Sequence, residues 1–191
     1  MPWRSWPKEV AALQGEHAER AVRPATASDA TAIARIYNAA ITARSATFET
    51  ERRTARERRA WLARHDARHP VLVAREGRRV VAFASVEAYR ARACYDGVGE
   101  FSVYVDPDRH GRGFGRLVLG ALIERCAELG YWKLLSRVFV ENVASRGLCR
   151  ALGCREVGIY ERHARLDGVW RDCVIVERVI GAGDGGAGLS G

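Results

Sequence analysis

The chain has 191 residues, 48% of them hydrophobic and 28% charged, and its 31 basic and 23 acidic side chains leave a net charge of +8. These values are typical of one soluble domain with a full hydrophobic core. Arginines supply nearly all of the positive charge and are scattered along the chain without aromatic interleaving. This pattern disfavours a nucleic-acid-binding function, and the lack of a long apolar run excludes a membrane-spanning segment.

The cysteines indicate a reducing compartment. There are five, an odd number, and no two of them form a C-x-x-C pair. This favours free thiols over a disulfide framework or a zinc site. The first twenty residues also lack the hydrophobic centre of a signal peptide. We therefore expect a cytoplasmic protein with no metal and with neither a membrane nor a nucleic-acid partner.

Composition divides the chain into three parts. Residues 1–20 hold Trp3, Trp6 and two prolines before a polar run, which predicts an N-terminal extension. Residues 21–180 carry the apolar periodicity of one folded domain. Residues 181–191 are rich in glycine and have almost nothing to bury, so we expect them to be disordered.

The first half of the domain begins with a strand pattern at residues 21–25. Ser28 is the expected N-cap of a helix whose apolar face ends at Ile41. A loop at 43–51 leads to Thr54-Ala-Arg-Glu57, a capping box for a second helix that we expect to end near His69. Strand patterns at 71–75 and 79–88 then flank a hairpin turn at 76–78.

The second half of the domain also contains both strand and helix patterns. Residues 98–105 predict a strand that ends at Asp106-Pro107, because proline cannot donate to the ladder. A helical pattern starts at Leu117 and stops at Gly130. A strand at 133–140, a helix at 143–152 and strands at 155–162 and 169–179 follow. This order predicts an α/β fold, a layered α+β domain built around a largely antiparallel sheet.

A glycine-spaced loop lies between the strand at 98–105 and the helix that follows it. Gly111, Gly113 and Gly115 alternate there with other residues, two of which are arginines. A glycine loop that opens a helix places free N–H groups at the positive end of the helix dipole, which suits a phosphate. The spacing matches neither the dinucleotide fingerprint nor a P-loop. The alternative is a connection without a ligand.

The run from His110 to Gly115 matches the acetyl-CoA pyrophosphate loop of the GNAT superfamily of N-acetyltransferases, except that His110 replaces the usual arginine or glutamine. The chain most resembles the phosphinothricin and arsinothricin N-acetyltransferases of this superfamily. The resemblance implies a mixed, largely antiparallel central sheet flanked by helices, with strands splayed apart at the acetyl-CoA site, and a homodimer. Further matching stretches are residues 47–48, 92–96, 100–105, 142–145 and 167–172.

The resemblance also implies how acetyl-CoA is held. Backbone groups of the strand pair with the pantetheine arm, and the loop binds the diphosphate. Asn142 matches a CoA-contacting asparagine, although its position equally suits a helix cap. The expected acetyl-CoA-binding residues are Val103, Tyr104, Val105, Gly111, Arg112, Gly113, Phe114, Gly115, Arg116 and Asn142.

Two residues are candidates for proton transfer. Glu100, at the position of the base in the resembled enzymes, would take a proton from the acceptor ammonium, unless it is a solvent-facing or salt-bridged carboxylate. Strand alternation would place Glu100, Ser102 and Tyr104 on one face, but the resemblance implies a bulge that breaks the alternation. Cys149 is the candidate acid, since an unperturbed thiol has a pKa of about 8.5. A small buried hydrophobe is the alternative for Cys149.

Four residues are candidates for binding the acceptor. Phe48 lies in a loop that covers the acceptor in the resembled enzymes, or it is a packing anchor. Arg92 and Tyr95 align with acceptor-binding positions, and Arg90 lies close to them in sequence. The alternative for either arginine is a solvated loop charge; we favour binding for Arg92 and leave Arg90 open. A guanidinium binds a carboxylate or phosphinate through two parallel hydrogen bonds. This composition favours a small anionic amino acid.

The sequence therefore predicts an acetyl-CoA-dependent N-acetyltransferase that acetylates the α-amine of a small amino acid such as phosphinothricin or arsinothricin, and so confers resistance. Attack would occur directly, within a ternary complex. The alternatives are acetylation of methionine sulfoximine, a polyamine or a protein N-terminus, a CoA-binding module without turnover, and a nucleic-acid-binding module.

Overall fold

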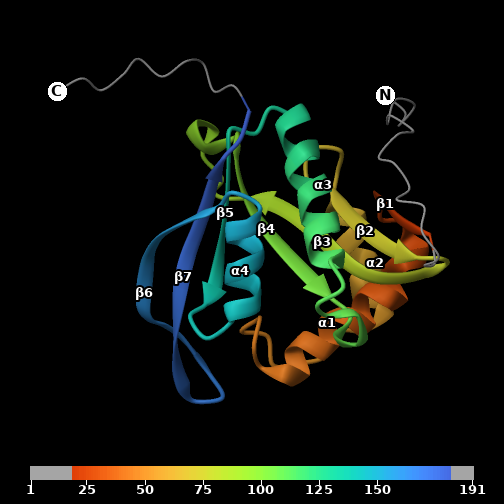
Figure 1. Cartoon of the computed structure of the whole chain (residues 1–191), viewed down its shortest axis with the longest axis horizontal. Coiled ribbons are helices and arrows are strands. Elements are labelled where there is room, and N and C mark those ends of the chain that lie inside the picture. Colours follow the sequence, from red (N-terminus) through yellow and green to blue (C-terminus); the bar gives the residue numbers. More distant parts are fainter. Residues whose placement is uncertain (1–18, 182–191) are drawn as a thin grey trace.

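The computed structural model describes residues 19–181, which form a seven-stranded sheet flanked by helices (Figure 1). The strand order is β1-β2-β3-β4-β5-β7-β6, and every neighbouring pair is antiparallel except β4 and β5. The predicted mixed, largely antiparallel sheet is thus confirmed. The strands are β1 (Arg20–Pro24), β2 (Val71–Glu76), β3 (Arg79–Ala88), β4 (Val98–Val105), β5 (Lys133–Phe139), β6 (Arg155–Leu166) and β7 (Val169–Val179).

Four α-helices are found among the described residues, and they cover both faces of the sheet. They are α1 (Ala30–Ala43), α2 (Ala55–Arg64), α3 (Phe114–Glu128) and α4 (Val143–Ala151). Figure 1 shows α3 crossing the front of the sheet, where Val118 and Leu122 join the larger buried cluster. Ile33 and Ile36 of α1 pack in a second cluster with Phe83 of β3, on the opposite face. The sheet is therefore buried on two sides, as helical layers require.

The strands β4 and β5 separate soon after they meet. Their parallel pairing covers only three residue pairs, from Val98 with Lys133 to Glu100 with Leu135. On its other side β4 pairs with β3 in an unbroken register, so the bulge that the resemblance implies is absent from this pair. Asp106 N–H donates to Val81 O of β3 (2.8 Å). Since backbone groups alternate along a strand, the N–H and C=O of Val103 point toward the gap left by β5.

Several predicted boundaries need correction. Ser28 does not cap the first helix: Asp29 accepts hydrogen bonds from Thr26 N–H (2.7 Å) and Thr26 Oγ1 (3.0 Å), which start a 3-10 turn ahead of α1. The capping box at Thr54 and Glu57 is present, but α2 ends at Arg64, earlier than predicted. The strand β6 runs past residue 162, because a register irregularity between Tyr160 and Ala164 lets the pairing resume. Its extra residues bring the strand to the turn at Asp167.

The two terminal parts of the chain are not described by the structure, apart from the few residues next to the domain. Residues 1–18 and 182–191 lie outside the described residues, so the predicted extension and the predicted disordered tail stay predictions. Within residues 19–181, no helix is long and apolar enough to cross a membrane.

Candidate active site

The loop between β4 and α3 presents unpaired amides at the start of a helix. Gly111 and Gly113 have φ of 73° and 84°, a left-handed conformation that favours glycine, and a Cβ at either position would meet open space. Leu117 N–H donates to Gly113 O (3.0 Å), so the N–H groups of the residues before it in α3 have no intrahelical acceptor. Amides in this position bind anions. The geometry supports the predicted diphosphate site.

Gly115 lies in the first turn of α3 and has a different role. A Cβ at this position would lie 3.1 Å from a methyl carbon of Leu148 on α4 and 3.3 Å from one of Val105 on β4. The missing side chain therefore lets the first turn of α3 approach both elements closely. This contact sets the loop against the end of β4, beside the gap between the strands.

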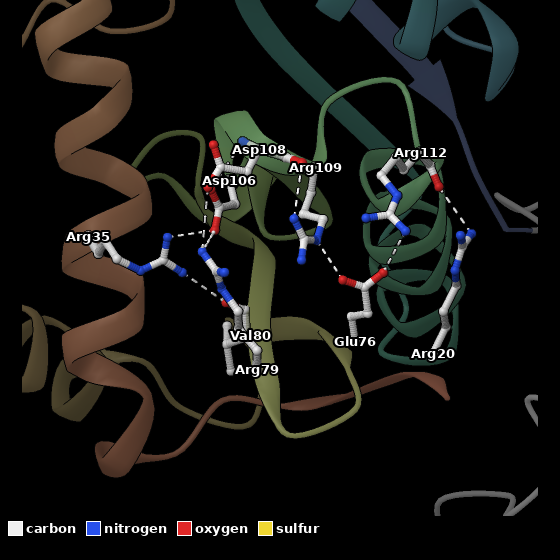
Figure 2. Close-up of polar contacts among 9 residues, drawn as sticks. All are labelled: Arg20, Arg35, Glu76, Arg79, Val80, Asp106, Asp108, Arg109 and Arg112. Carbon is white, nitrogen blue, oxygen red and sulfur yellow. Dashed lines mark hydrogen bonds and ion pairs between the residues drawn. The ribbon is translucent and has the colours of Figure 1, made fainter. Parts of the chain in front are cut away.

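The arginines around the loop are held by buried or half-buried carboxylates (Figure 2). Glu76, at the end of β2, accepts from Arg109 Nε (2.5 Å) and forms an ion pair with Arg112 (3.0 Å). Hydrogen bonding from Arg109 lowers the pKa of Glu76. The guanidinium of Arg112 is paired with Glu76, and its predicted contact with the diphosphate stays a prediction. Arg116 is exposed and has no ion pair with residues 19–181.

Asp106 holds the end of β4 in place. Its side chain is buried and accepts from Arg35 of α1 (2.5 Å) and Arg79 of β3 (2.8 Å), as Figure 2 shows. Burial alone would raise the pKa of Asp106, but the hydrogen bonds from Arg35 and the Asp108 N–H hold it below its usual value. The carboxylate thus ties α1, β3 and the start of the glycine loop together.

A cavity of about 670 Å³ runs from the glycine loop along the free edge of β4. Alanines of α1 form one wall and the small residues of α4 form the other. His110 Nε2 lies within hydrogen-bond distance of Val105 O (3.1 Å), the last carbonyl on this edge of β4. The carbonyl of Val103, on the same edge, is left free for a ligand. We call this space the donor cavity. Every predicted acetyl-CoA-binding residue except Arg112 lines this cavity.

Asn142 lies where the donor cavity meets the next one. Its Oδ1 accepts from Ser145 N–H (3.0 Å) and its Nδ2 donates to Ser45 O (2.9 Å). The amide therefore caps α4 and ties this helix to the loop after α1. The capping role is observed, and the contact with CoA stays a prediction.

A second cavity of about 670 Å³ adjoins the donor cavity and shares Val103, Tyr104 and Asn142 with it. We call it the acceptor cavity. Glu100 lines it, 27% of its side chain is exposed, and its Oε1 accepts from Arg137 Nε (3.0 Å) and from a second nitrogen of the same guanidinium. The salt-bridged alternative is thus observed, yet the pair sits in a cavity wall. No hydrogen bond from residues 19–181 reaches Oε2, which leaves this oxygen open to a proton.

Cys149 also lines the acceptor cavity, but its thiol is buried. A hydrogen bond with the Cys154 sulfur, together with burial, raises the pKa of Cys149 far above its usual value. A thiol with such a pKa is a weak acid toward a leaving thiolate of ordinary pKa. The proton-donor role stays a prediction, and the geometry favours the small buried hydrophobe.

The structure brings one of the four predicted acceptor-binding residues into the cavity. Phe48 lines it and packs edge-on against Phe139, with ring centroids 4.8 Å apart, so it is also a packing anchor. Arg90, Arg92 and Tyr95 lie in the loop between β3 and β4 and line neither cavity. Arg90 stacks over Tyr89 there, at 5.0 Å from the ring centroid. The binding role of these three residues stays a prediction.

Sequence reasoning missed several residues of the acceptor cavity. Arg137 of β5 pairs with Glu100. A charged residue within an apolar strand indicates a functional or paired side chain, and this signal applied to Arg137 as it did to Glu100. Tyr37 and His163 come from α1 and β6, which are far from β4 in sequence. No local pattern marks them. Within residues 19–181, no group of three or more metal-ligating side chains is found.

Comparison with known proteins agrees with this geometry. Residues 33–154 match the Acetyltransferase (GNAT) family. A phosphinothricin N-acetyltransferase of Alcaligenes faecalis is 37% identical over 85% of this chain and 84% of its own length. An L-methionine sulfoximine/L-methionine sulfone acetyltransferase of Pseudomonas paraeruginosa is 32% identical over 82% of this chain and 92% of its own. The structure of a phosphinothricin acetyltransferase from Sinorhizobium meliloti in complex with acetyl-CoA superposes with a TM-score of 0.82, covering 90% and 94% of the two chains at 28% identity.

The chain belongs to the GNAT family of acetyltransferases. It is an acetyl-CoA-dependent N-acetyltransferase. Two of its relatives are named for the acceptors phosphinothricin and L-methionine sulfoximine.

Proposed function

We propose that this enzyme acetylates the α-amine of a small anionic amino acid such as phosphinothricin or arsinothricin. The observation that carries the proposal is the junction of two cavities at the gap between β4 and β5, with anion-binding amides at the far end of one and Glu100 in the wall of the other. Two substrates held in adjoining cavities react as if in one molecule, which supplies a large part of the rate.

The donor cavity would hold acetyl-CoA along the open edge of β4. The amides at the start of α3 bind the diphosphate, and the exposed Arg116 adds positive charge. The free N–H and C=O of Val103 pair with the pantetheine arm. An N–H group at this edge also stabilises the charge that develops on the thioester oxygen.

Glu100 would act as the general base in the acceptor cavity. Its Oε2 takes a proton from the acceptor ammonium, directly or through a water, and the neutral amine attacks the thioester carbon. The C–S bond breaks as the C–N bond forms, and CoA leaves as a thiolate. The nitrogen loses its second proton as the amide forms, and the thiolate takes up a proton to give the free thiol, so the reaction releases one proton overall, through Glu100. Arg137 holds Oε1, so the carboxylate keeps one orientation during the transfer.

The Glu100→Gln variant tests this mechanism. We expect kcat to fall by about 10²–10⁴-fold, the usual contribution of a general base, while the Kd of CoA stays unchanged. The measurement is steady-state kinetics with phosphinothricin, together with calorimetry of CoA binding. Glu128→Gln, at the exposed end of α3, is the matched control and should keep wild-type kcat. An unchanged kcat in Glu100→Gln would contradict the assignment of the base.

Methionine sulfoximine is the second candidate acceptor, because an acetyltransferase named for it is a relative at 32% identity. The two candidates differ in charge, since the side chain of phosphinothricin carries an anion and that of methionine sulfoximine does not. Comparing kcat/KM for the two with the wild-type enzyme decides between them. A cytoplasmic location, a resistance function and a homodimer belong to the same proposal.

A further inference from the structure

Arg58 of α2 is an unusual residue in this molecule. Among residues 19–181 it is the only buried arginine, and 8% of its surface is exposed. Burying a cation is costly unless it gains partners in the protein. The burial of Arg58 is therefore expected to be offset by contacts of its guanidinium.

Arg58 differs from the other buried charges in having no ion pair. Asp29, Asp106 and Glu177 each accept hydrogen bonds from arginine or lysine side chains. Arg58 has no hydrogen bond or ion pair from its side chain to residues 19–181, and its Nε is buried without a partner. The structure thus satisfies each of its buried carboxylates and leaves its buried guanidinium open.

Two aromatic rings hold the guanidinium in place. Its central carbon lies 3.8 Å from the centroid of the Tyr37 ring and 5.1 Å from that of Trp61. Cation–π contacts of this kind offset part of the cost of burial, and they use the faces of the guanidinium. The N–H groups lie in its plane, so they remain free to donate to a planar oxyanion.

Arg58 lines a third cavity, of about 510 Å³, which continues the acceptor cavity. The two share Tyr37, Ser102 and Tyr104, and the unbroken register of β4 places Ser102 and Tyr104 on the same sheet face as Glu100. A molecule whose amine lies near Glu100 can therefore extend along this face toward Arg58.

The carboxylates in this third cavity already have partners. Glu49 forms an ion pair with Arg53, and Glu57 accepts from Thr54 at the start of α2. Glu87 accepts from Trp61 Nε1 (3.3 Å) and faces His65 Nε2 at 3.8 Å. None of these carboxylates pairs with Arg58, so an anion from outside the described chain is needed to do so.

We propose that Arg58 is a specificity-determining residue that binds an oxyanion of the acceptor amino acid. The inference rests on the proposed function for the identity of the acceptor, and on the third cavity for the position of the anion. The anion is either the α-carboxylate or an anionic group of the side chain, since both present the same pair of oxygens. The ion pair with the acceptor replaces the partner that the protein does not provide.

The test compares Arg58→Met with the wild-type enzyme and with Arg59→Met, a control that removes an exposed arginine from the next position of the same helix. Three probes are titrated calorimetrically in the presence of CoA. L-Phosphinothricin carries both anions, L-methionine sulfone carries only the α-carboxylate, and the α-amide of phosphinothricin carries only the side-chain anion. Steady-state kinetics are measured with the same probes.

We expect Arg58→Met to weaken phosphinothricin binding at least about tenfold, because a charge-assisted pair is lost, and to leave CoA binding unchanged. The probe that lacks the recognised anion should bind the wild-type and Arg58→Met enzymes equally, which identifies the anion. Arg58→Lys should restore part of the affinity. A merely structural role would instead change the affinities for all three probes by the same factor.

Equal phosphinothricin affinities of Arg58→Met and Arg59→Met would overturn the inference, as would an equal loss for all three probes. Turnover decides the proposed function separately. If the wild-type enzyme binds these probes through Arg58 but acetylates none of them, the proposed acceptor is wrong and the anion site stands. If it acetylates them without any dependence on Arg58, the proposed function stands and the anion site does not.

Discussion

Single residues in this enzyme show two ways of handling a buried charge. Asp106 is buried with two arginines as partners, while Arg58 is buried against two rings with no counter-ion from residues 19–181. The first arrangement stabilises the fold, because the ion pairs and hydrogen bonds of the carboxylate offset its desolvation free energy. The second is costly for the fold, and the proposed acceptor anion would offset this cost. Groups that are left unsatisfied in an otherwise well-paired structure are therefore informative about ligands.

Gly113 permits a test at the scale of one residue. Gly113→Ala places a Cβ at φ 84° in the open space before the first amides of α3. The left-handed conformation costs about 1–2 kcal/mol for alanine. We also expect KM for acetyl-CoA to rise about tenfold or more, because the methyl group hinders a charge-assisted contact of the diphosphate with the backbone.

Gly130→Ala is the matched control for this variant. Gly130 has φ 82°, its Cβ would also meet open space, and it lies at the opposite end of α3. Urea unfolding should show a similar loss of stability for both variants, while steady-state kinetics should show the change in KM for Gly113→Ala alone. A similar rise in KM for both variants would show that general destabilisation, rather than the anion site, causes the effect.

At the scale of elements, the carboxylates beside the glycine loop join segments that are distant in sequence. Asp106 at the end of β4 accepts from Arg35 of α1 and Arg79 of β3, and Glu76 of β2 holds Arg109 and Arg112 of the loop (Figure 2). The loop is therefore anchored at its start and along its length. Anchoring of this kind keeps the amides at the start of α3 in position before the ligand binds.

Asp106→Asn tests the contribution of this anchor. We expect the variant to lose about 1–2 kcal/mol of stability near neutral pH, a value reduced from that of a fully buried pair because both arginines are partly exposed. Asp108→Asn, whose side chain is 74% exposed, should lose much less. Urea unfolding at several pH values measures both effects. Equal stabilities of Asp106→Asn and the wild-type enzyme near neutral pH would contradict the anchoring role.

The pH dependence of the Asp106 contribution follows from the direction of its pKa shift. The pKa of Asp106 is lowered in the folded state, so the unfolded chain takes up this proton at the higher pH. The stabilisation is therefore complete above the unfolded pKa of about 3.9 and is lost as pH falls through the lower folded value. The difference between the wild-type enzyme and Asp106→Asn should be constant near pH 7 and should shrink below about pH 4.

At the scale of the whole molecule, the separation of β4 and β5 creates the site. Their pairing stops after Glu100, and the donor and acceptor cavities meet beyond that point. Elements from both ends of the domain then complete the walls, since the loop after α1 supplies Phe48 and β6 supplies His163. The site thus depends on the packing of the whole domain around one interrupted strand pair.

The hairpin of β6 and β7 permits a prediction on assembly. β6 is an edge strand, and Ile159 and Trp170 expose 56% and 47% of their surfaces. Exposed apolar edges of this kind are usually covered in solution. If the hairpin forms the proposed homodimer interface, Ile159→Glu combined with Trp170→Glu should give a monomer by light scattering. Val143→Glu, 72% exposed on α4, should leave the mass unchanged, and a dimeric double variant would contradict the proposal.

Local sequence patterns were sufficient to predict the order of the elements and the position of the donor loop. Alternation, capping boxes and glycine stops are local signals, because they depend on residues a few positions apart. They located each strand of the domain and the glycines of the loop. The errors concern boundaries: the cap at Ser28, the ends of α2 and β6, and the start of α3, which is Phe114 and not Leu117. At boundaries several local patterns compete, and tertiary contacts select one.

Which side chains share a cavity depends on how distant segments pack together, so the sequence did not reveal it. The place of Arg112 in the loop predicts a contact with the diphosphate, but only the structure shows that its guanidinium pairs with Glu76 at the end of β2. No local pattern distinguishes Arg58 from the other arginines of α2, yet it is buried against Tyr37 and lines the cavity that continues the acceptor cavity. The partner of a charged side chain depends on contacts between distant segments, and no periodicity in the sequence records those contacts.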